Sequence, residues 1–228
     1  MSGKEMEQVV EELKIKYKSP EWYALRTKGI GGSDAASVLG LSPWKKNTDL
    51  WKEKVGLVQS SFKTNKRMEE GSLAEDPIAQ LFAIEHADEY EFVDYKDTVF
   101  KRGHRFASVD GGLIEKATGR KGGLEIKHTE PNSRKAWEQW DDKIPDYYYC
   151  QILHYLSTTG WDFYILKVRF KSYSLDENGK KKLVITEREY KFERSEEEDS
   201  IKVLEKAEDD FWKCVIAKKE PPLKLPPI

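Results

Sequence analysis

Two carboxylates and a lysine fall into a spacing that can do chemistry. Glu125 and Lys127 are separated by Ile126. On a β-strand, residues two apart point to the same face, so Glu125 and Lys127 share one face and Ile126 lies on the other. If residues 117–120 form the turn of a hairpin, Asp110 lies opposite Lys127 and close to Glu125. The segment therefore predicts three functional groups on one face of a hairpin.

These groups suit the hydrolysis of a phosphodiester. Carboxylate oxygens of Asp110 and Glu125, with the carbonyl of Ile126, are ligands that Mg²⁺ accepts, and Mn²⁺ is expected to substitute for it. The dication makes a water more acidic and neutralises charge that builds on the phosphate. Lys127 would position that water or help to deprotonate it. A surface ladder of ion pairs on an exposed strand is the alternative that these residues leave open.

A third carboxylate, Glu75, has the spacing of an apolar stripe that includes Ile78 and Phe82. On a helix over residues 67–86 this stripe faces the sheet, and a carboxylate there needs a cation or several hydrogen-bond donors. We therefore expect Glu75 beside the metal. If Pro77 begins the helix, Glu75 is instead an exposed carboxylate favoured by the helix dipole.

Gln151 lies in a strongly aromatic segment, Tyr147-Tyr-Tyr-Cys-Gln151. Its amide would orient the attacking water or hold a metal-bound one, and a buried amide with ordinary partners is the alternative. His154 and His128 are expected to be structural, because His154 lies within a packed helix and His128 points away from the face of Lys127.

A second group precedes a predicted short helix. Gly31 and Gly32 expose backbone N–H groups ahead of the Ser33-Asp34 cap, which is a ready anion site. Arg26 would add a forked contact to a phosphate, and Trp22 a stacking face for a base. The predicted phosphate ligands are therefore Arg26, Gly32 and Ser33. An ordinary turn is the alternative, and Trp44 and Trp51 are expected to pack in the core or at an interface.

The elements that must position these groups follow from periodicity and turn residues. Helices are predicted over residues 5–17, 20–26, 33–40, 48–55, 67–86, 146–157 and 195–217. Strands are predicted over residues 91–95, 98–101, 106–115, 122–129, 161–173 and 183–192, the last two joined by a turn at 176–179. The pattern predicts an α/β (α+β) fold of one domain, residues 1–228, with a central mixed sheet, flanking helices and a proline-rich tail at 221–228.

Composition excludes some classes of protein. No stretch is long and apolar enough for a membrane span, and the two cysteines have no metal-ligand spacing, so a cytoplasmic setting is expected. The net charge of −2 argues against a protein that coats nucleic acid. Residues 101–135 hold nine Lys/Arg against four Asp/Glu, and residues 186–210 hold five against eleven. A basic face for local contact with a polyanion and chance clustering both remain open.

Several short motifs occur in one order along residues 22–160. They are Ile30-Gly-Gly-Ser-Asp34, Leu39-Gly-Leu-Ser-Pro43-Trp44, Leu50-Trp-Lys-Glu-Lys-Val-Gly56, Gly71 with Glu75, Asp110-Gly111, Leu124-Glu-Ile-Lys127, and Gln151 with His154-Tyr155. As an ordered set they resemble the YqaJ-like viral recombinase family, relatives of lambda exonuclease in the PD-(D/E)XK nuclease superfamily. Val109 stands where the superfamily name has proline, at a position that supplies no catalytic atom.

The resemblance implies a restriction-endonuclease-like core that hydrolyses DNA with Mg²⁺. By motif position, Asp110 and Glu125 would be metal ligands and Lys127 the catalytic lysine, with Glu75 near the metal and Gln151 as the motif glutamine. Arg26 and Ser33 fall where such relatives contact a 5′ phosphate. The family further implies a phage or prophage protein that degrades the 5′-ended strand of linear duplex DNA, as a ring-shaped trimer, with a single-strand annealing protein as partner.

Three rival functions are weighed against this one. A glycoside hydrolase also uses paired carboxylates, but it needs neither Lys127 nor a metal. A non-catalytic DNA-binding or scaffold protein of the same fold should tolerate loss of Asp110, Glu125 and Lys127, yet all three are present with Glu75 and Gln151. A structure-specific DNA-binding protein or endonuclease of the same fold stays open as the alternative. An iron–sulfur nuclease usually needs four cysteine ligands, and this chain has two.

Overall fold

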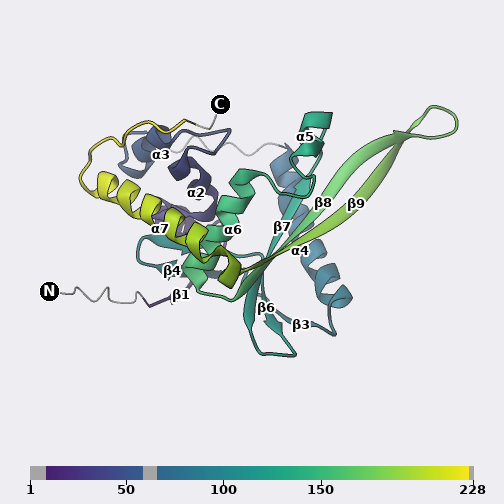
Figure 1. Cartoon of the computed structure of the whole chain (residues 1–228), viewed down its shortest axis with the longest axis horizontal. Helices are drawn as coiled ribbons and strands as arrows, with labels where there is room; N and C mark the ends of the chain where they lie inside the picture. The colour runs from purple at the N-terminus through teal and green to yellow at the C-terminus, as the bar shows by residue number, and fades with distance from the viewer. Residues whose placement is uncertain (1–8, 59–65, 226–228) are drawn as a thin grey trace.

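The computed structural model describes residues 9–58 and 66–225 (Figure 1). Its helices are α1 (Pro20–Arg26), α2 (Gly32–Leu39), α3 (Asn47–Lys54), α4 (Lys66–Glu85), α5 (Arg134–Glu138), α6 (Asp146–Thr159) and α7 (Arg194–Ile216). Its strands are β1 (Glu11–Lys14), β2 (Ile30–Gly31), β3 (Tyr90–Val93), β4 (Thr98–Arg102), β5 (Arg105–Ala107), β6 (Gly111–Glu115), β7 (Lys121–Thr129), β8 (Phe163–Leu175) and β9 (Lys181–Glu193).

The strands form two mixed sheets. The larger has the order β3-β6-β7-β8-β9, and its only parallel pair among the described strands is β7 with β8. The smaller has the order β1-β4-β5-β2, with β2 parallel to β5. The predicted fold class, a mixed sheet flanked by helices, is confirmed, although the strands divide between two sheets instead of forming one.

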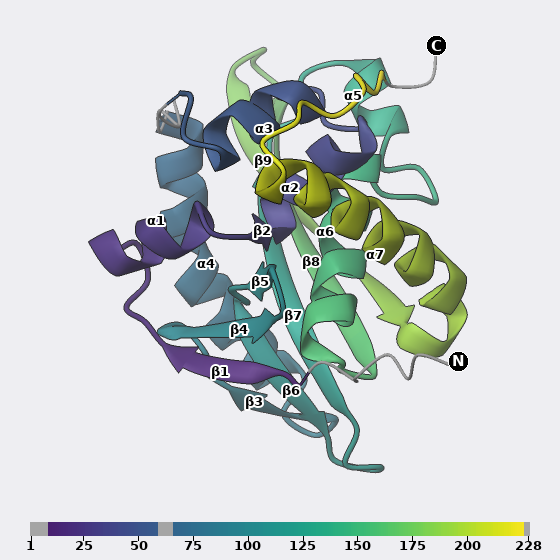
Figure 2. The ribbon, with the colours of Figure 1, turned by 90° about the vertical axis from the view of Figure 1, so that its left-hand side faces the viewer.

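Helices cover both faces of the larger sheet. On one face, Ile78 and Phe82 of α4 pack against Ile126 of β7. On the other face, α6 packs among Leu166 and its neighbours on β8, and α7 lies outside α6 and α2 (Figure 2). The apolar stripe predicted for α4 therefore faces the sheet as expected. Within the described residues, none of the helices is long and apolar enough to span a membrane.

The predicted first helix, residues 5–17, is wrong in the part that the structure describes. Residues 1–8 lie outside the described residues, and Glu11–Lys14 form strand β1, antiparallel to β4. From Leu13 onward the apolar residues alternate, and Leu13, Ile15 and Tyr17 pack against a cluster that includes Trp22. Pairing with β4 stabilises the strand that this alternation favours, and it outweighs the helical pattern on which the prediction rested.

The predicted strand over residues 106–115 is divided, and its register differs from the prediction. Residues 108–110 separate β5 from β6. Gly111 pairs with Leu124, so Asp110 lies level with Glu125 instead of Lys127. The turn closes one residue earlier than predicted, because the Glu115 N–H donates to the Arg120 carbonyl (2.9 Å) and Gly119 takes a positive φ of 75°.

Other elements agree closely with their predictions. Ser19 caps α1 through the Trp22 N–H, and α7 ends at Ile216, before the proline-rich tail. The turn at 176–179 joins β8 and β9 into a long hairpin, whose outer end projects from the body (Figure 1). Helix α5 was not predicted. The two cysteines, Cys150 and Cys214, are free thiols.

Candidate active site

Asp110, directly before β6, lies beside Glu125 and Lys127 in the middle of β7. The Ile126 N–H donates to Asp110 Oδ2 (2.7 Å), which fixes the carboxylate beside β7. Lys127 Nζ forms an ion pair with Glu125 Oε1, as residues on one face of a strand can. Ile126 points the other way and is buried. The predicted group is therefore assembled, with Asp110 two residues from its expected register.

Burial and mutual repulsion shape the ionisation of this group. Burial and the charge of Glu125 raise the pKa of Asp110 to about 8, and burial also raises the pKa of Glu125. Although burial lowers the pKa of Lys127, the charges of Glu125 and Asp110 outweigh it and raise this pKa. Without a bound cation, these buried carboxyl groups therefore tend to keep a proton, and a cation between them would favour their charged forms.

Gln151 of α6 joins the group from the facing element. Its Nε2 donates to Glu125 Oε1 and to the Tyr155 hydroxyl, both at 2.8 Å. The other oxygen of that carboxylate, Glu125 Oε2, is buried and has no hydrogen-bond partner among the described residues. A buried carboxylate oxygen without a donor fits a metal ligand, and the carboxylates of Asp110 and Glu125 form the hard oxygen set that Mg²⁺ requires.

Glu75 lies in a helix that runs unbroken through Pro77, so the exposed N-terminal alternative is wrong. Burial and the charge of Asp110 raise the pKa of Glu75, whereas Lys127 lowers it. Glu75 therefore lies within electrostatic reach of Asp110 and Lys127, and its place beside a metal stays a prediction. In the described part of the chain, the three potential ligand atoms that lie within 4.8 Å of one another belong to Glu85, His86 and Glu189 instead.

That second cluster already contains its own cation. Lys167 Nζ lies 3.3 Å from Glu85 and 2.8 Å from Glu189. The three residues also lie at the far end of α4 from Glu75. Because a buried ammonium already neutralises these carboxylates, we assign them to the packing of α4 against β9.

The predicted phosphate ligands also come together. Arg26 Nη2 donates to Ser33 Oγ (2.7 Å), and the Arg26 guanidinium lies over the Trp22 ring, 4.8 Å from its centroid. Trp22 itself is 8% exposed and donates from Nε1 to Ser108 Oγ (3.1 Å). The predicted stacking of a base on Trp22 is therefore wrong, since its faces are occupied. Trp22 supports Arg26 instead.

The glycine pair brings the phosphate group and the carboxylate group side by side. Gly32 begins α2, and a Cβ placed on it would lie 2.5 Å from the Tyr155 ring and 3.1 Å from Gln151 Cγ. Because it lacks that carbon, the N-terminus of α2 packs directly against the part of α6 that holds Glu125. The two groups predicted separately from the sequence thus form one site.

The structure adds residues that the sequence did not single out. Asp34, expected with Ser33 as a cap, is the third residue of α2 and accepts from the Gly31 N–H (3.1 Å), so the cap is Gly31. Lys54 Nζ donates to Asp34 Oδ2 (2.8 Å) and to the Arg26 carbonyl (2.7 Å). Asp34 and Lys54 both lay within the recognised motifs, residues 30–34 and 50–56, but no local signal paired one with the other.

Tyr17 also lies within reach of the site's charges. Burial raises the pKa of its phenol to about 12, and the charges of Glu75, Asp110 and Glu125 add to the increase. Its ring packs edge-on against Trp22 (centroids 5.2 Å apart). The sequence offered no signal for this residue, which was expected at the end of a helix.

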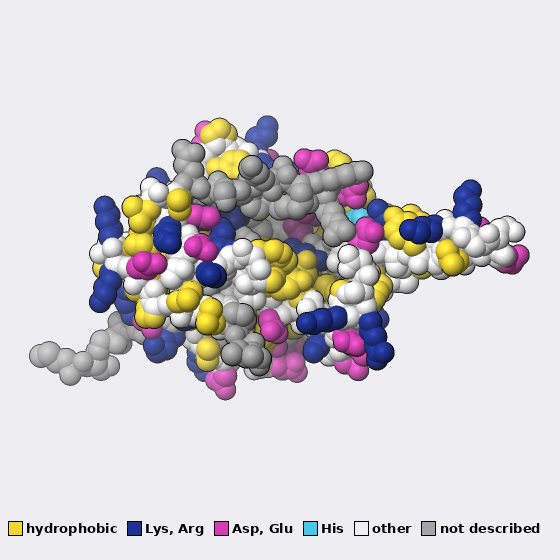
Figure 3. Space-filling view, turned by 90° about the horizontal axis from the view of Figure 1, so that it is seen from above, with side chains coloured by type: hydrophobic (Ala, Val, Ile, Leu, Met, Phe, Trp, Pro, Cys, Tyr) yellow, Lys and Arg dark blue, Asp and Glu magenta, His cyan; other side chains and the backbone are white. Residues whose placement is uncertain are grey.

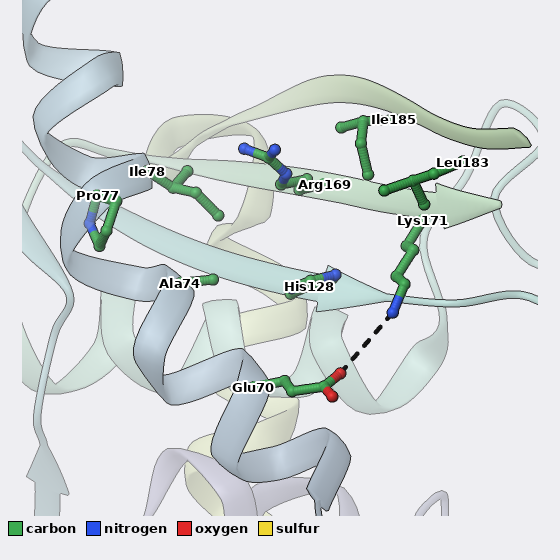
Figure 4. Close-up of a pocket in the computed structure, with 9 residues that line it drawn as sticks. All are labelled: Glu70, Ala74, Pro77, Ile78, His128, Arg169, Lys171, Leu183 and Ile185. Carbon is green, nitrogen blue, oxygen red and sulfur yellow. Dashed lines mark ion pairs between the residues drawn. The ribbon is translucent and has the colours of Figure 1, made fainter.

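His154 and His128 are the two histidines for which a structural role was predicted. His154 is fully buried, with Nδ1 2.7 Å from Glu208 and Nε2 3.0 Å from the Phe106 carbonyl, so it ties α6 to α7 and β5. His128 faces a groove of about 410 Å³ on the opposite face of β7, which Arg169, Lys171 and Glu70 also line (Figure 4). Both positions agree with the predicted structural roles.

Comparison with known proteins gives a family and a fold. The model of the YqaJ-like viral recombinase domain matches residues 21–162. The uncharacterized protein YqaJ of Bacillus subtilis (strain 168) is 35% identical over 195 residues, which are 84% of this chain and 54% of that protein. The chain thus spans about half the length of this curated relative.

Solved structures share the architecture. LHK-Exo in complex with dAMP aligns with a TM-score of 0.57 at 20% identity, over 88% of this chain and 94% of that one. The alkaline exonuclease LHK-Exo from Laribacter hongkongensis aligns with a TM-score of 0.53 at the same identity and coverage. The chain therefore has the exonuclease fold. Since the domain model covers more than half of its residues, the chain belongs to the YqaJ-like viral recombinase family.

Proposed function

We propose that this chain is a Mg²⁺-dependent DNA exonuclease that degrades the 5′-ended strand of linear duplex DNA for recombination by single-strand annealing. We call Arg26, Gly32 and Ser33 the phosphate cradle. The observation that carries the proposal is the contact of Gly32 with Gln151 and Tyr155, which brings this cradle beside the carboxylates and the lysine. A site of this kind can hold a strand end and cut the strand beside it.

Asp110 and Glu125 would hold the metal, and the Ile126 carbonyl and Glu75 would be its further ligands. Mn²⁺ is expected to substitute for Mg²⁺. The metal, when bound, would make a water more acidic and neutralise charge on the phosphate. Lys127 lies beside the same carboxylates, in ion-pair contact with Glu125. It would donate a hydrogen bond to the attacking water or the phosphate, or help to deprotonate that water.

Arg26 and Ser33 would bind the 5′ phosphate of the strand end. In the reaction, the water oxygen bonds to phosphorus, the bond from phosphorus to O3′ breaks, and O3′ takes a proton. The remaining strand then begins with a new 5′ phosphate, which is the group that a guanidinium and helix N-terminus bind. The dAMP in the LHK-Exo structure is a nucleoside monophosphate, the class of product that such cuts release.

The wider assembly is part of the proposal. Residues 1–228 would act as one nuclease domain, a ring-shaped trimer would enclose the duplex, and an annealing protein would receive the single strand. These features rest on the family to which the chain belongs.

A cleavage assay with defined ends tests the proposal. Linear duplex DNA with a 5′ phosphate and a label on one strand is incubated with the protein in Mg²⁺, in Mn²⁺ or in EDTA, next to a closed circular duplex. We expect metal-dependent loss of the 5′-phosphorylated strand, no cutting of the circle, and no cutting by Asp110→Ala.

Other outcomes separate the alternatives. Cutting of the circle would keep the hydrolytic site and favour a structure-specific endonuclease over an end-dependent enzyme. Cleavage that continues in EDTA would contradict the metal site. Binding to DNA with no cleavage in any metal would favour a DNA-binding protein that retained the fold.

A further inference from the structure

A series of aromatic rings leads from Lys127 to the surface. The Lys127 ammonium lies 5.3 Å from the centroid of the Tyr148 ring. Tyr148 packs edge-on against Tyr147 at 4.4 Å between centroids, and Tyr147 packs edge-on against Trp44 at 4.6 Å. Trp44 ends the series at the surface, where 74% of it is exposed. An indole exposed to this extent has at least one face open to solvent.

The loop between α2 and α3 holds this indole in place. Ser42 Oγ accepts from the backbone N–H groups of Trp44 and Lys45, each at 3.3 Å. Lys45 Nζ pairs with Glu53 of α3 at 2.6 Å. The backbone around Trp44 is therefore fixed by its own hydrogen bonds, while the ring points outward. An ordered loop thus presents an exposed aromatic ring in a fixed place, as a surface that stacks a base requires.

Helix α6 places this ring on a particular side of the active site. Along α6, Tyr147 contacts Trp44, Tyr148 lies under Lys127, Gln151 donates to Glu125, and Tyr155 packs against Gly32. Along the helix, Glu125 and Lys127 thus lie between the phosphate cradle and Trp44. From residue 147 to residue 155 the helix rises about 12 Å, which a strand spans in a few nucleotides at about 3.4 Å each.

We propose that Trp44 stacks on a base of the strand being cut, on the side of the scissile phosphate away from the 5′ end. This inference rests on the proposed function and names a subsite for it. Every base has a π-face, so an indole can hold successive bases without regard to sequence. The exposed Lys46 beside Trp44 would meet the backbone of the same strand.

The position favours DNA over a second protein copy as the occupant. The aromatic series is continuous with Lys127, so a protein seated on Trp44 would crowd the strand beside Lys127. The face seen from above carries hydrophobic (yellow), basic (dark blue) and acidic (magenta) side chains close to one another (Figure 3). Trp44 and the exposed Lys46 combine an aromatic and a basic side chain, as single-strand binding surfaces do.

The test measures binding separately from cleavage. Duplexes with a short 5′-phosphorylated single-stranded end carry one abasic site, or one 2-aminopurine, at each of the first five positions. Anisotropy in EDTA gives affinity, and 2-aminopurine fluorescence reports stacking. We expect Trp44→Ala to weaken binding roughly 5- to 150-fold, and Trp44→Phe to keep most of it. Tyr173→Ala, an exposed aromatic on the distant hairpin, is the matched control.

Combining Trp44→Ala with an abasic site in the DNA identifies the base that the indole contacts. In the parent protein, an abasic site at one position beyond the scissile phosphate should weaken binding as much as Trp44→Ala does, and the two changes together should add nothing further. The 2-aminopurine at that position should be quenched by the parent protein and by Trp44→Phe, but not by Trp44→Ala. Circular dichroism melting confirms that each variant is folded.

The other results overturn the inference. If the effects of Trp44→Ala and of an abasic site add at every position, or if Trp44→Ala binds as tightly as the parent protein, there is no base subsite at Trp44. Metal-dependent cleavage in the same samples would still support the proposed function. Coupling in EDTA with no cleavage in any metal would keep the subsite and reject the nuclease. If light scattering shows that Trp44→Ala lowers the oligomeric state and DNA affinity per assembly is unchanged, Trp44 contacts a second copy instead.

Discussion

The surroundings of Lys127 show how carboxylates that repel one another can be held together around one ammonium. Three carboxylates surround it, and burial makes each of their charges costly. Their charges keep Lys127 protonated, so it serves as a fixed donor beside Glu125. Lys127 is the cation that offsets these carboxylates, so its removal leaves them to take up protons instead.

Lys127→Ala should lower cleavage of linear duplex DNA by about 10²- to 10⁴-fold, because the donor at the phosphate is lost. Binding in EDTA should be unchanged, since Lys127 holds no metal and the buried carboxylates can take up protons. Rates with Mg²⁺ and anisotropy with EDTA check both expectations. Lys121→Ala, at the exposed start of the same strand, is the control. A variant that fails to fold would show that Lys127 is structural.

Arg26→Ala should lower the preference for 5′-phosphorylated over 5′-hydroxyl ends by roughly tenfold or more, because a charge-assisted forked contact is lost. Arg26→Lys keeps the charge without the fork and should recover only part of the preference. Cleavage rates on matched duplexes measure it. Equal rates of the parent protein on both kinds of end would remove Arg26 from phosphate recognition.

At the scale of elements, helix α2 depends on a buried ion pair. Asp34 and Lys54 are both almost completely buried and 2.8 Å apart, and Lys54 also holds the last turn of α1 at the Arg26 carbonyl. Burial opposes ionisation of Asp34, but Lys54 and Arg26 outweigh it and lower its pKa to about 2. The pair thus fixes the three elements that form the phosphate cradle.

The pH dependence of stability follows from this shift. Because the pKa of Asp34 is lower in the folded state, its contribution of about 2 kcal/mol should be present above pH 4 and lost as the pH falls toward 2. The difference in unfolding free energy between parent and Asp34→Asn should therefore shrink over that range in urea titrations. For Asp49→Asn, which removes an exposed pair with Lys52, a small constant difference is expected. A constant difference for Asp34→Asn would contradict the assignment.

In the whole molecule, the basic and acidic segments meet each other. Arg105 of the basic segment pairs with Glu208 and Asp209 of the acidic one (2.7 and 2.6 Å), and Arg120 pairs with Glu193 (2.7 Å). The predicted basic face therefore loses part of its charge to the packing of α7 and β9. We therefore expect DNA contact at Arg26, Ser33 and exposed lysines more than along this segment as a whole.

Arg105→Ala should destabilise the fold by about 3–5 kcal/mol, since it removes the guanidinium that pairs with the buried Glu208 carboxylate. The salt dependence of DNA binding by the folded fraction should stay unchanged, because Arg105 faces α7. Lys206→Ala removes an exposed pair with Asp210 and should cost less than about 1 kcal/mol. Urea unfolding and anisotropy titrations measure the two effects. A flatter salt dependence for Arg105→Ala would instead place it at the DNA.

The sequence by itself determined which candidate side chains share a face and most of the elements. The period of two around Ile126 predicted the shared face of Glu125 and Lys127, and the stripe through Ile78 predicted the direction of Glu75. Such patterns are local, because the alternation of a strand or helix lies within a few residues. The fold class and the family followed from the same local patterns, taken in order along the chain.

Only the tertiary structure decided what depends on distant partners. Strand β1 formed where a helix was predicted because β4 was available to pair with it, and the register of Asp110 was set by a turn that closed one residue earlier. The contact of Gly32 with Gln151, the buried Lys54 and the position of Trp44 beside Tyr147 join residues remote in sequence. Packing energy between elements chooses such contacts, and no local pattern records it.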